Sequence, residues 1–181
     1  MIWQTDSSGA INRVLDGTVD LALTGQNTGD DSCVFIPFCQ DNMVIATPVN
    51  DHYLNLKQKE QPVVFQDFIK DPVIIREKGS GTKKEMDIFL ENAGIEPSSL
   101  NVVARMNDLE SIKKSIVNGL GFSILSARSV VDLQKTKQIL LFPLEESAHK
   151  RSFYIVYRKN RILKSHVRQF IHYVKEYYQT V

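Results

Sequence analysis

Hydrophobic and polar positions follow two alternating patterns along this chain. Short apolar runs of about four to eight residues are separated by stretches in which apolar residues recur every three or four positions. The first pattern is typical of β-strands and the second of amphipathic helices, so their alternation predicts an α/β fold. The predicted strands are 1–4, 19–25, 33–39, 43–49, 72–76, 101–106, 121–125, 138–144 and 152–158.

The stretches with helical periodicity carry start and stop signals. Ser7 or Ser8 is placed to cap the first of them, and Gly17 is placed to end it. Asn107 and Glu110 have the spacing of a capping box at the start of another helix. The predicted helices are 7–17, 83–93, 107–119, 126–133 and 165–179, with a short helix or turn at 63–71.

Two polar segments interrupt these patterns. Gln40, Asp41 and Asn42 divide the apolar run at 33–49, which predicts a break between two strands. The stretch 50–62 is polar and shows neither periodicity, which predicts an irregular connection.

The composition narrows the class of protein. The 181 residues are 43% hydrophobic and 24% charged, which is typical of one globular domain or two small lobes. The formal net charge is +1, so charge gives no reason to expect nucleic acid or a membrane as a partner. No apolar run approaches the roughly 20 residues of a membrane span. The first residues do not resemble a secretion signal, so we expect a cytoplasmic protein.

The two cysteines, Cys33 and Cys39, lie in one predicted extended run. Residues at this spacing on a strand are separated by about 20 Å, which is too far for a disulfide. The spacing also matches no zinc motif. We therefore expect two reduced, buried thiols.

The sequence contains no recognisable catalytic motif. Neither G-x-S-x-G nor H-E-x-x-H occurs, and the stretch KGSGTKKE lacks the residue order of a P-loop. We therefore expect no catalysis, no cofactor and no metal site.

Three predicted helix starts are rich in small polar residues, at 5–8, 79–82 and 107–108. Free N–H groups and the positive end of the helix dipole favour an anion at such a position, and glycine lets the backbone approach a ligand closely. Each start taken alone is also explained as a helix cap. Together they predict a site for a small polar or anionic molecule, because ligands of open α/β sheets bind at strand carboxyl ends.

Several consecutive blocks of the sequence carry a family resemblance. The blocks are SSGAINRVLDGTVDLAL, VIIREKGSGTKKEMDIFLENAGI, VARMNDLESIKKSIVNGLGFSILSARSV and LFPLEE…RSFYIVYRKNR…SHVRQFIHYV. In this order and spacing they resemble the effector-binding domain of LysR-type transcriptional regulators. The winged helix-turn-helix of that family is absent from these 181 residues, as are the first strand and helix of its effector domain.

The resemblance implies a two-lobed fold like that of type II periplasmic binding proteins, with two crossing strands and an effector between the lobes. The lobes would be 1–49 with 151–181, and 50–150. The partners it implies are a small anionic or carboxylate metabolite, a second copy in a homodimer or higher oligomer, and DNA only through the absent helix-turn-helix. By position, the effector-binding residues would be Ser7, Ser8, Thr24, Gly79, Ser80, Gly81 and Thr82.

Two rival interpretations stay open at this point. A stand-alone solute-binding protein of the same fold would need a signal peptide or a lipoprotein cysteine near its start, and these residues show neither. A small-molecule enzyme on a bilobal fold would need a paired acid and base in the cleft, and the sequence shows no such pair.

Overall fold

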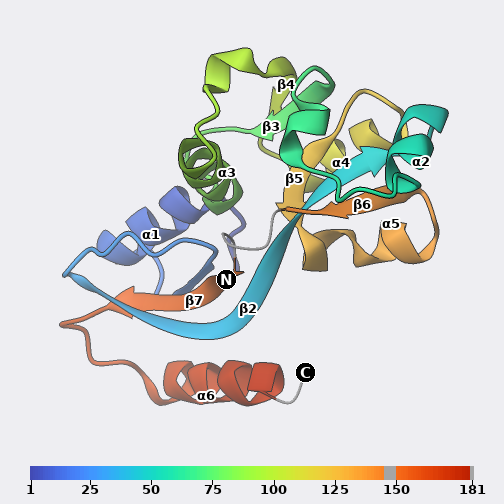
Figure 1. Cartoon of the computed structure of the whole chain (residues 1–181). Coiled ribbons are helices and arrows are strands. Elements are labelled where there is room, and N and C mark those ends of the chain that lie inside the picture. The colour runs from blue at the N-terminus through green and yellow to red at the C-terminus, as the bar shows by residue number, and fades with distance from the viewer. Residues whose placement is uncertain (145–149, 180–181) are drawn as a thin grey trace. The chain divides into compact units, whose positions relative to one another are not determined.

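The computed structural model describes residues 1–144 and 150–179 of the chain. Strands and helices alternate as the sequence predicts, and Figure 1 shows their arrangement. The elements are α1 (Ser7–Leu15), β1 (Ala22–Thr24), β2 (Cys33–Pro48), α2 (Asp51–Lys57), η1 (Phe65–Phe68), β3 (Pro72–Arg76), α3 (Gly81–Asn92), η2 (Pro97–Ser99), β4 (Asn101–Met106), α4 (Leu109–Val117), β5 (Ser123–Ser126), η3 (Ala127–Val130), α5 (Val131–Lys135), β6 (Ile139–Pro143), β7 (Lys150–Arg158) and α6 (Ser165–Gln179).

Two units make up the chain. The first comprises Met1–Asp41, Gly79–Gly81 and Arg151–Val181. The second comprises Asn42–Lys78 and Thr82–Lys150. The lobes expected from the sequence differ from these units over 42–49 and over Gly79–Gly81, and the limits of the lobes stay a prediction.

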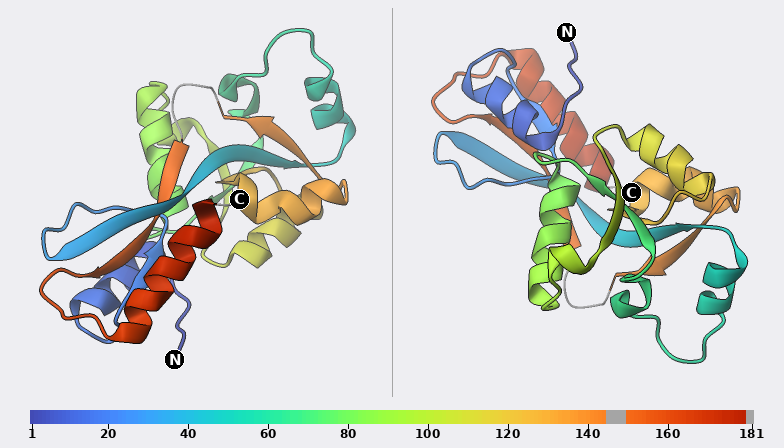
Figure 2. Two further views of the ribbon diagram at one scale, coloured as in Figure 1. Left: turned by 90° about the horizontal axis from the view of Figure 1, so that it is seen from below. Right: turned by 90° about the horizontal axis from the view of Figure 1, so that it is seen from above.

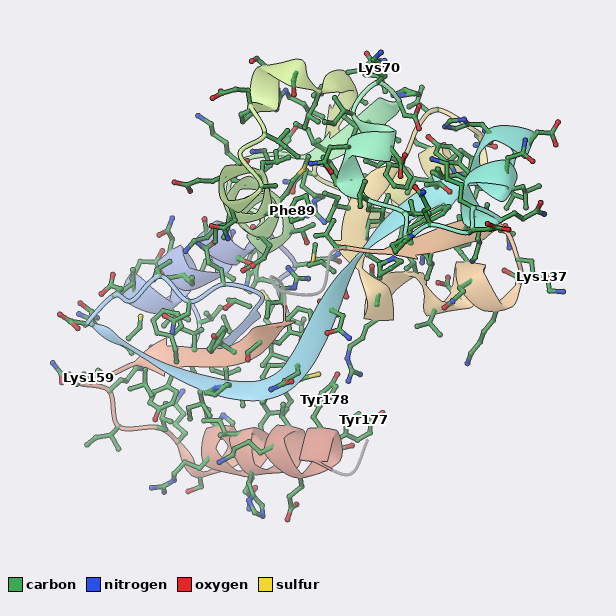
Figure 3. The ribbon with its side chains drawn as sticks, viewed as in Figure 1. Lys70, Phe89, Lys137, Lys159, Tyr177 and Tyr178 are labelled. Carbon is green, nitrogen blue, oxygen red and sulfur yellow. The ribbon has the colours of Figure 1, made fainter. Side chains whose placement is uncertain are left out.

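The first unit is a layered structure in which α1 and α6 cover opposite faces of the strands β1, β7 and β2 (Figures 1 and 2). Strand β1 runs antiparallel to β7. On one face, Val14 of α1 packs in a core with Cys33 and Val156. On the other face, the ring of Tyr178 on α6, which is labelled in Figure 3, packs against β2. It lies 5.1 Å from the ring of Phe38.

The second unit places two cores on opposite faces of its strands. Strand β2 continues into this unit and pairs antiparallel with both β5 and β6. Side chains alternate between the two faces of a strand. Ile45 therefore joins an aromatic core with Phe68 and Phe89, which is labelled in Figure 3, whereas Ala46 joins a second core with Ile112 of α4.

The predicted break at Gln40–Asn42 is wrong, because β2 runs without interruption from Cys33 to Pro48. Polar residues stay inside the strand because Asp41 forms a buried ion pair with Arg151 on β7. The segment 1–4 also has no regular secondary structure, against the strand predicted there. The strand predicted at 19–25 shortens to β1, because the amide of Val19 bonds back to the carbonyl of Arg13.

The polar stretch 50–62, predicted to be irregular, contains helix α2. Its start is capped by Asn50, whose side chain accepts from the amide of Tyr53 over 3.1 Å. Tyr53 and Leu56, three positions apart, are the buried residues of the helix. These two apolar positions are too few to show a helical period in the sequence.

The predictions for the helix ends and for the cysteines are confirmed. Gly17, Gly94 and Gly119 end their helices with φ of 79°, 64° and 82°, which is backbone that glycine adopts readily. Cys33 and Cys39 are free and buried. Within the two described ranges, no helix combines the length and the apolar character that crossing a membrane would require.

Candidate functional site

The first free amides of helix α1 are hydrogen-bonded to other groups of the protein, and we call such a helix start closed. Its N-cap is Asp6, not Ser7 or Ser8 as predicted, and the Asp6 Oδ1 atom accepts from the amide of Gly9 over 2.7 Å. The amide of Ser8 donates to the carbonyl of Gly79 over 3.1 Å, and that of Ala10 donates to the Asp6 carbonyl over 2.9 Å. The Ala10 bond is the first regular bond of the helix, so the protein itself uses two of the N–H groups that a helix start leaves free, those of Ser8 and Gly9.

The glycines of the Gly79–Gly81 turn are explained by close packing against α1 and β1. Gly79 has φ of 93°, and a Cβ atom there would lie 2.7 Å from Oδ2 of Asp6. A Cβ atom on Gly81 would lie 2.7 Å from the carbonyl oxygen of Gly25. Any side chain at either position would thus collide with the rest of the first unit, so these glycines allow the turn to fit the protein.

Two hydroxyl groups in this turn region have no partner in the described part of the chain. Ser80 is only 6% exposed, and its hydroxyl makes no hydrogen bond among residues 1–144 and 150–179. The hydroxyl of Ser7 is likewise unpaired within those ranges, and its Oγ atom lies 3.2 Å from the position of a Cβ on Gly81. Both hydroxyl oxygens are accessible to solvent. A hydroxyl that is accessible and has no partner in the protein can bond to a ligand, so these groups are candidates for binding one.

The remaining predicted site residues differ in their surroundings. Thr24 is 3% exposed, and its Oγ1 atom donates to the carbonyl of Gln26 over 2.8 Å. Its hydroxyl therefore serves the local turn. Thr82 follows Gly81 in α3 and is grouped with the second unit. The structure thus places Ser7, Ser8, Thr24, Gly79, Ser80 and Gly81 in the first unit.

The third predicted helix start lies in the second unit and is also closed. The N-cap of α4 is Asp108, whose Oδ2 atom accepts from the amide of Ser111 over 2.7 Å, so the predicted capping box of Asn107 and Glu110 is wrong. Hydrogen bonds from the side chain and amide of Ser111 lower the pKa of Asp108. An aspartate accepts more strongly here than the Asn107 amide would, because it also complements the helix dipole.

Sequence reasoning missed four residues around the turn, namely Asp6, Gly25, Asp41 and Arg151. Asp6 had a readable signal, since an aspartate three positions before a helical amide is a typical N-cap. Arg151 and Asp41 had none, because their pairing joins positions that are 110 residues apart. Among the described residues, no group of three or more His, Cys, Asp and Glu side chains could hold a metal ion.

Comparison with protein families gives one match that covers nearly the whole chain. Residues 2–179 match the family described as LysR substrate binding domain. A relative is the HTH-type transcriptional regulator CysL of Bacillus subtilis, which is 31% identical over 131 residues. That alignment covers 72% of this chain and 40% of the relative, so the chain spans less than half of that regulator.

Solved structures share the fold. The effector binding domain of QuiR in complex with shikimate superposes with a TM-score of 0.83 at 16% identity, covering 98% of this chain and 80% of that one. The regulatory domain of CcmR from Synechocystis PCC6803 in complex with 2-PG gives a TM-score of 0.82 at 21% identity, covering 96% and 80%. These values establish the predicted two-lobed fold of the type II periplasmic-binding-protein kind.

Proposed function

Since this chain belongs to the family of LysR substrate-binding domains, we propose that it is the effector-sensing domain of a transcriptional regulator. We propose further that Ser7 and Ser80 bind a small anionic molecule. The observation that carries this site is the Ser80 hydroxyl, which belongs to a largely buried residue, is accessible to solvent and has no hydrogen-bond partner among the described residues. It lies in a turn that packs directly against the start of α1, the helix that carries Ser7.

The charge near the turn restricts the chemistry of the ligand. Asp6 places a carboxylate at the start of α1, beside Gly79, and this carboxylate disfavours a second negative charge next to it. Each carboxylate oxygen has a further lone pair, which favours an O–H donor of the ligand at that side. Ser7 and Ser80 carry hydroxyl donors that suit an anionic oxygen. A hydroxylated carboxylic acid meets both requirements.

The names of the related structures support a small anionic ligand. The QuiR domain was solved with shikimate and the CcmR domain with 2-PG. In our proposal, Gly79 and Gly81 give the turn its shape, Thr24 braces the neighbouring turn, and Ser8 holds the two together through its amide. Thr82 stays a proposed ligand contact by position alone.

Calorimetric titration tests the site directly. The wild-type chain is titrated with shikimate, 2-PG, sulfate and a panel of small hydroxy acids and simple carboxylates. Replacing Ser7 or Ser80 with alanine removes a hydrogen bond to a charged group, which is worth about 1.5–3 kcal/mol, so each variant should bind roughly tenfold to a hundredfold more weakly. Ser98→Ala is the matched control, because Ser98 is exposed and belongs to η2 in the second unit.

The outcomes separate the alternatives. Weaker binding by Ser7→Ala and Ser80→Ala, with unchanged binding by Ser98→Ala, supports the site. If a ligand binds and both site variants bind it as tightly as the wild type, the site assignment is wrong. Conversion of a bound ligand to product would contradict the proposal that the domain senses and does not catalyse.

We also propose the context in which the domain works. Relatives such as CysL are named as transcriptional regulators, which supports action in the cytoplasm and contact with DNA through a separate domain. Self-association as a homodimer or higher oligomer is part of this proposal. Sedimentation at micromolar concentration tests it, and a monomer throughout would count against it.

A further inference from the structure

A buried ion pair joins the two long strands of the first unit. The Nε atom of Arg151 on β7 donates to the Oδ2 atom of Asp41 on β2 over 2.8 Å. The side chains are 6% and 0% exposed, respectively. A buried charge is unfavourable unless it is paired, so each of these residues depends on the other, and the pair fixes β2 against β7 at this point.

Arg151 also packs against the turn that follows β1. Its guanidinium lies 5.1 Å from the centre of the Phe153 ring, and its Nη1 atom is 3.5 Å from the position that a Cβ on Gly25 would take. The carbonyl of Gly25 in turn packs against Gly81. An unbroken series of contacts therefore leads from the ion pair through Gly25 to the turn that carries Ser80.

Both residues of the pair lie at a limit of the first unit. Asp41 is the last residue of the first unit on β2, and Arg151 is the first residue of that unit on β7. The ion pair therefore lies at the point where both strands leave the unit. A displacement of the Gly79–Gly81 turn would reach both strands at this point through Gly25 and Arg151.

We propose that Arg151 and Asp41 are positioning residues for the effector site. The pair holds the Thr24–Gly25 turn against Gly81 and connects that turn to the two strands. The functional meaning of this role rests on the effector site proposed above, but the packing itself is measurable without any ligand.

The test must distinguish positioning from general stabilisation of the fold. Arg151→Lys keeps a positive charge opposite Asp41 but loses the planar guanidinium over Phe153 and the Nη1 atom beside Gly25. Arg161→Lys is the matched control, because Arg161 pairs with Asp20 over 2.9 Å in the same unit. A purely stabilising role predicts a uniform change throughout the unit, and a positioning role predicts a change confined to the turns.

Amide hydrogen exchange measured by NMR reports this difference at two neighbouring residues of α1. The amide of Ser8 bonds to Gly79 in the turn, whereas the amide of Gly9 bonds to the Asp6 side chain. Arg151→Lys should accelerate exchange at Ser8 by at least about tenfold and leave Gly9 and the amides of β7 unchanged. Arg161→Lys should leave Ser8 unchanged.

Two results would overturn the proposal: unchanged exchange at Ser8 in Arg151→Lys, or an equal acceleration at all amides of the unit. Should Arg151→Lys not fold, Phe153→Leu keeps the ion pair while removing the ring beside the guanidinium, and the same two criteria then apply to it.

Titration with shikimate and 2-PG adds the functional readout. If either binds the wild type, Arg151→Lys should bind it several-fold more weakly and Arg161→Lys should bind it normally. Equal affinity of Arg151→Lys and the wild type would contradict the positioning role in binding. If neither ligand binds any of the proteins, the proposed ligand class is at fault, and the exchange result alone decides the positioning role.

Discussion

The starts of helices α1 and α3 differ in whether the polar groups there find hydrogen-bond partners within the protein. Helix α1 begins at Asp6, whose carboxylate accepts from Gly9, while Gly79 accepts from the amide of Ser8. Ser80 stands immediately before α3, and its hydroxyl has no partner among the described residues. The first start is closed by the protein itself, and the second is left with an unused polar group. Small polar residues at a helix start therefore do not by themselves indicate an open site.

Helix α4 supplies a second closed start, which makes the comparison more general. Asp108 caps it through the amide of Ser111 in the same way that Asp6 caps α1 through Gly9. In both cases an aspartate brings its own negative charge to the end of the helix where a ligand anion would otherwise bind. The Gly-Ser-Gly turn contributes no acidic residue of its own, although the carboxylate of Asp6 lies beside Gly79.

The largest expected effect on the free energy of unfolding comes from Gly79→Ala, which disturbs the packing of the turn before α3 against the start of α1. The new Cβ would force backbone with φ of 93° on alanine and would lie 2.7 Å from Oδ2 of Asp6. The positive φ costs about 1–2 kcal/mol and the overpacking about 1–3 kcal/mol more. Urea unfolding gives the loss of stability.

Gly29→Ala is the matched control for this change. Gly29 also has a positive φ of 70°, but no atom lies within 4 Å of its Cβ position. It should lose only the cost of the backbone conformation. Equal losses in the two variants would show that Gly79 is not packed against Asp6 as described.

The next effect compares the two aspartate caps. Asp6→Ala should lower the free energy of unfolding by about 0.5–2 kcal/mol, because it removes the acceptor for a helix amide. Asp108→Ala should lower it as well, for the same reason. The asparagine variant at each position keeps an acceptor and should recover most of the loss. Urea unfolding of the four variants measures this. A negligible loss in Asp6→Ala would contradict the closed start of α1.

The sequence was sufficient for the order and type of most elements, because apolar periodicity and terminal glycines are local signals. Helix α6 and the ends at Gly17, Gly94 and Gly119 illustrate this. The sequence led to a wrong prediction where a residue far away along the chain pairs with a polar residue inside a strand. Asp41 in an apolar run predicts a break in the strand, but its ion pair with Arg151 allows it to be buried inside the strand. No local pattern could reveal that partner.

The candidate site was predictable to a similar extent. The Gly-Ser-Gly-Thr turn is visible in the sequence as a glycine-rich helix start. Its glycines were interpreted as a means for a ligand to approach, whereas Gly79 and Gly81 fit the turn against Asp6 and Gly25. That distinction depends on tertiary packing, so sequence reasoning could not make it.

A smaller effect is expected in the acid dependence of the α4 cap. Hydrogen bonds with Ser111 lower the pKa of Asp108 from its ordinary value of 3.8. A carboxyl group with a lowered pKa stabilises the fold fully above its ordinary value, and this contribution disappears as the pH falls through the lower, folded value. The stability difference between the wild type and Asp108→Asn should therefore shrink below pH 3.8. Urea midpoints between about pH 6 and pH 2.5 test this, and a difference independent of pH would contradict it.

The smallest effect on stability is expected at Ser80, although this residue is central to the proposed binding. Removing a hydroxyl that has a partner costs about 0.5–1.5 kcal/mol, but the Ser80 hydroxyl makes no hydrogen bond among the described residues. Because no hydrogen bond within the described residues is lost, Ser80→Ala should change the free energy of unfolding by less than about 0.5 kcal/mol. Urea unfolding without ligand measures the change, with Asp6→Ala as the contrasting variant. A loss at Ser80 as large as that at Asp6 would mean that the second helix start is also closed by the protein, and the contrast between the two starts would be wrong.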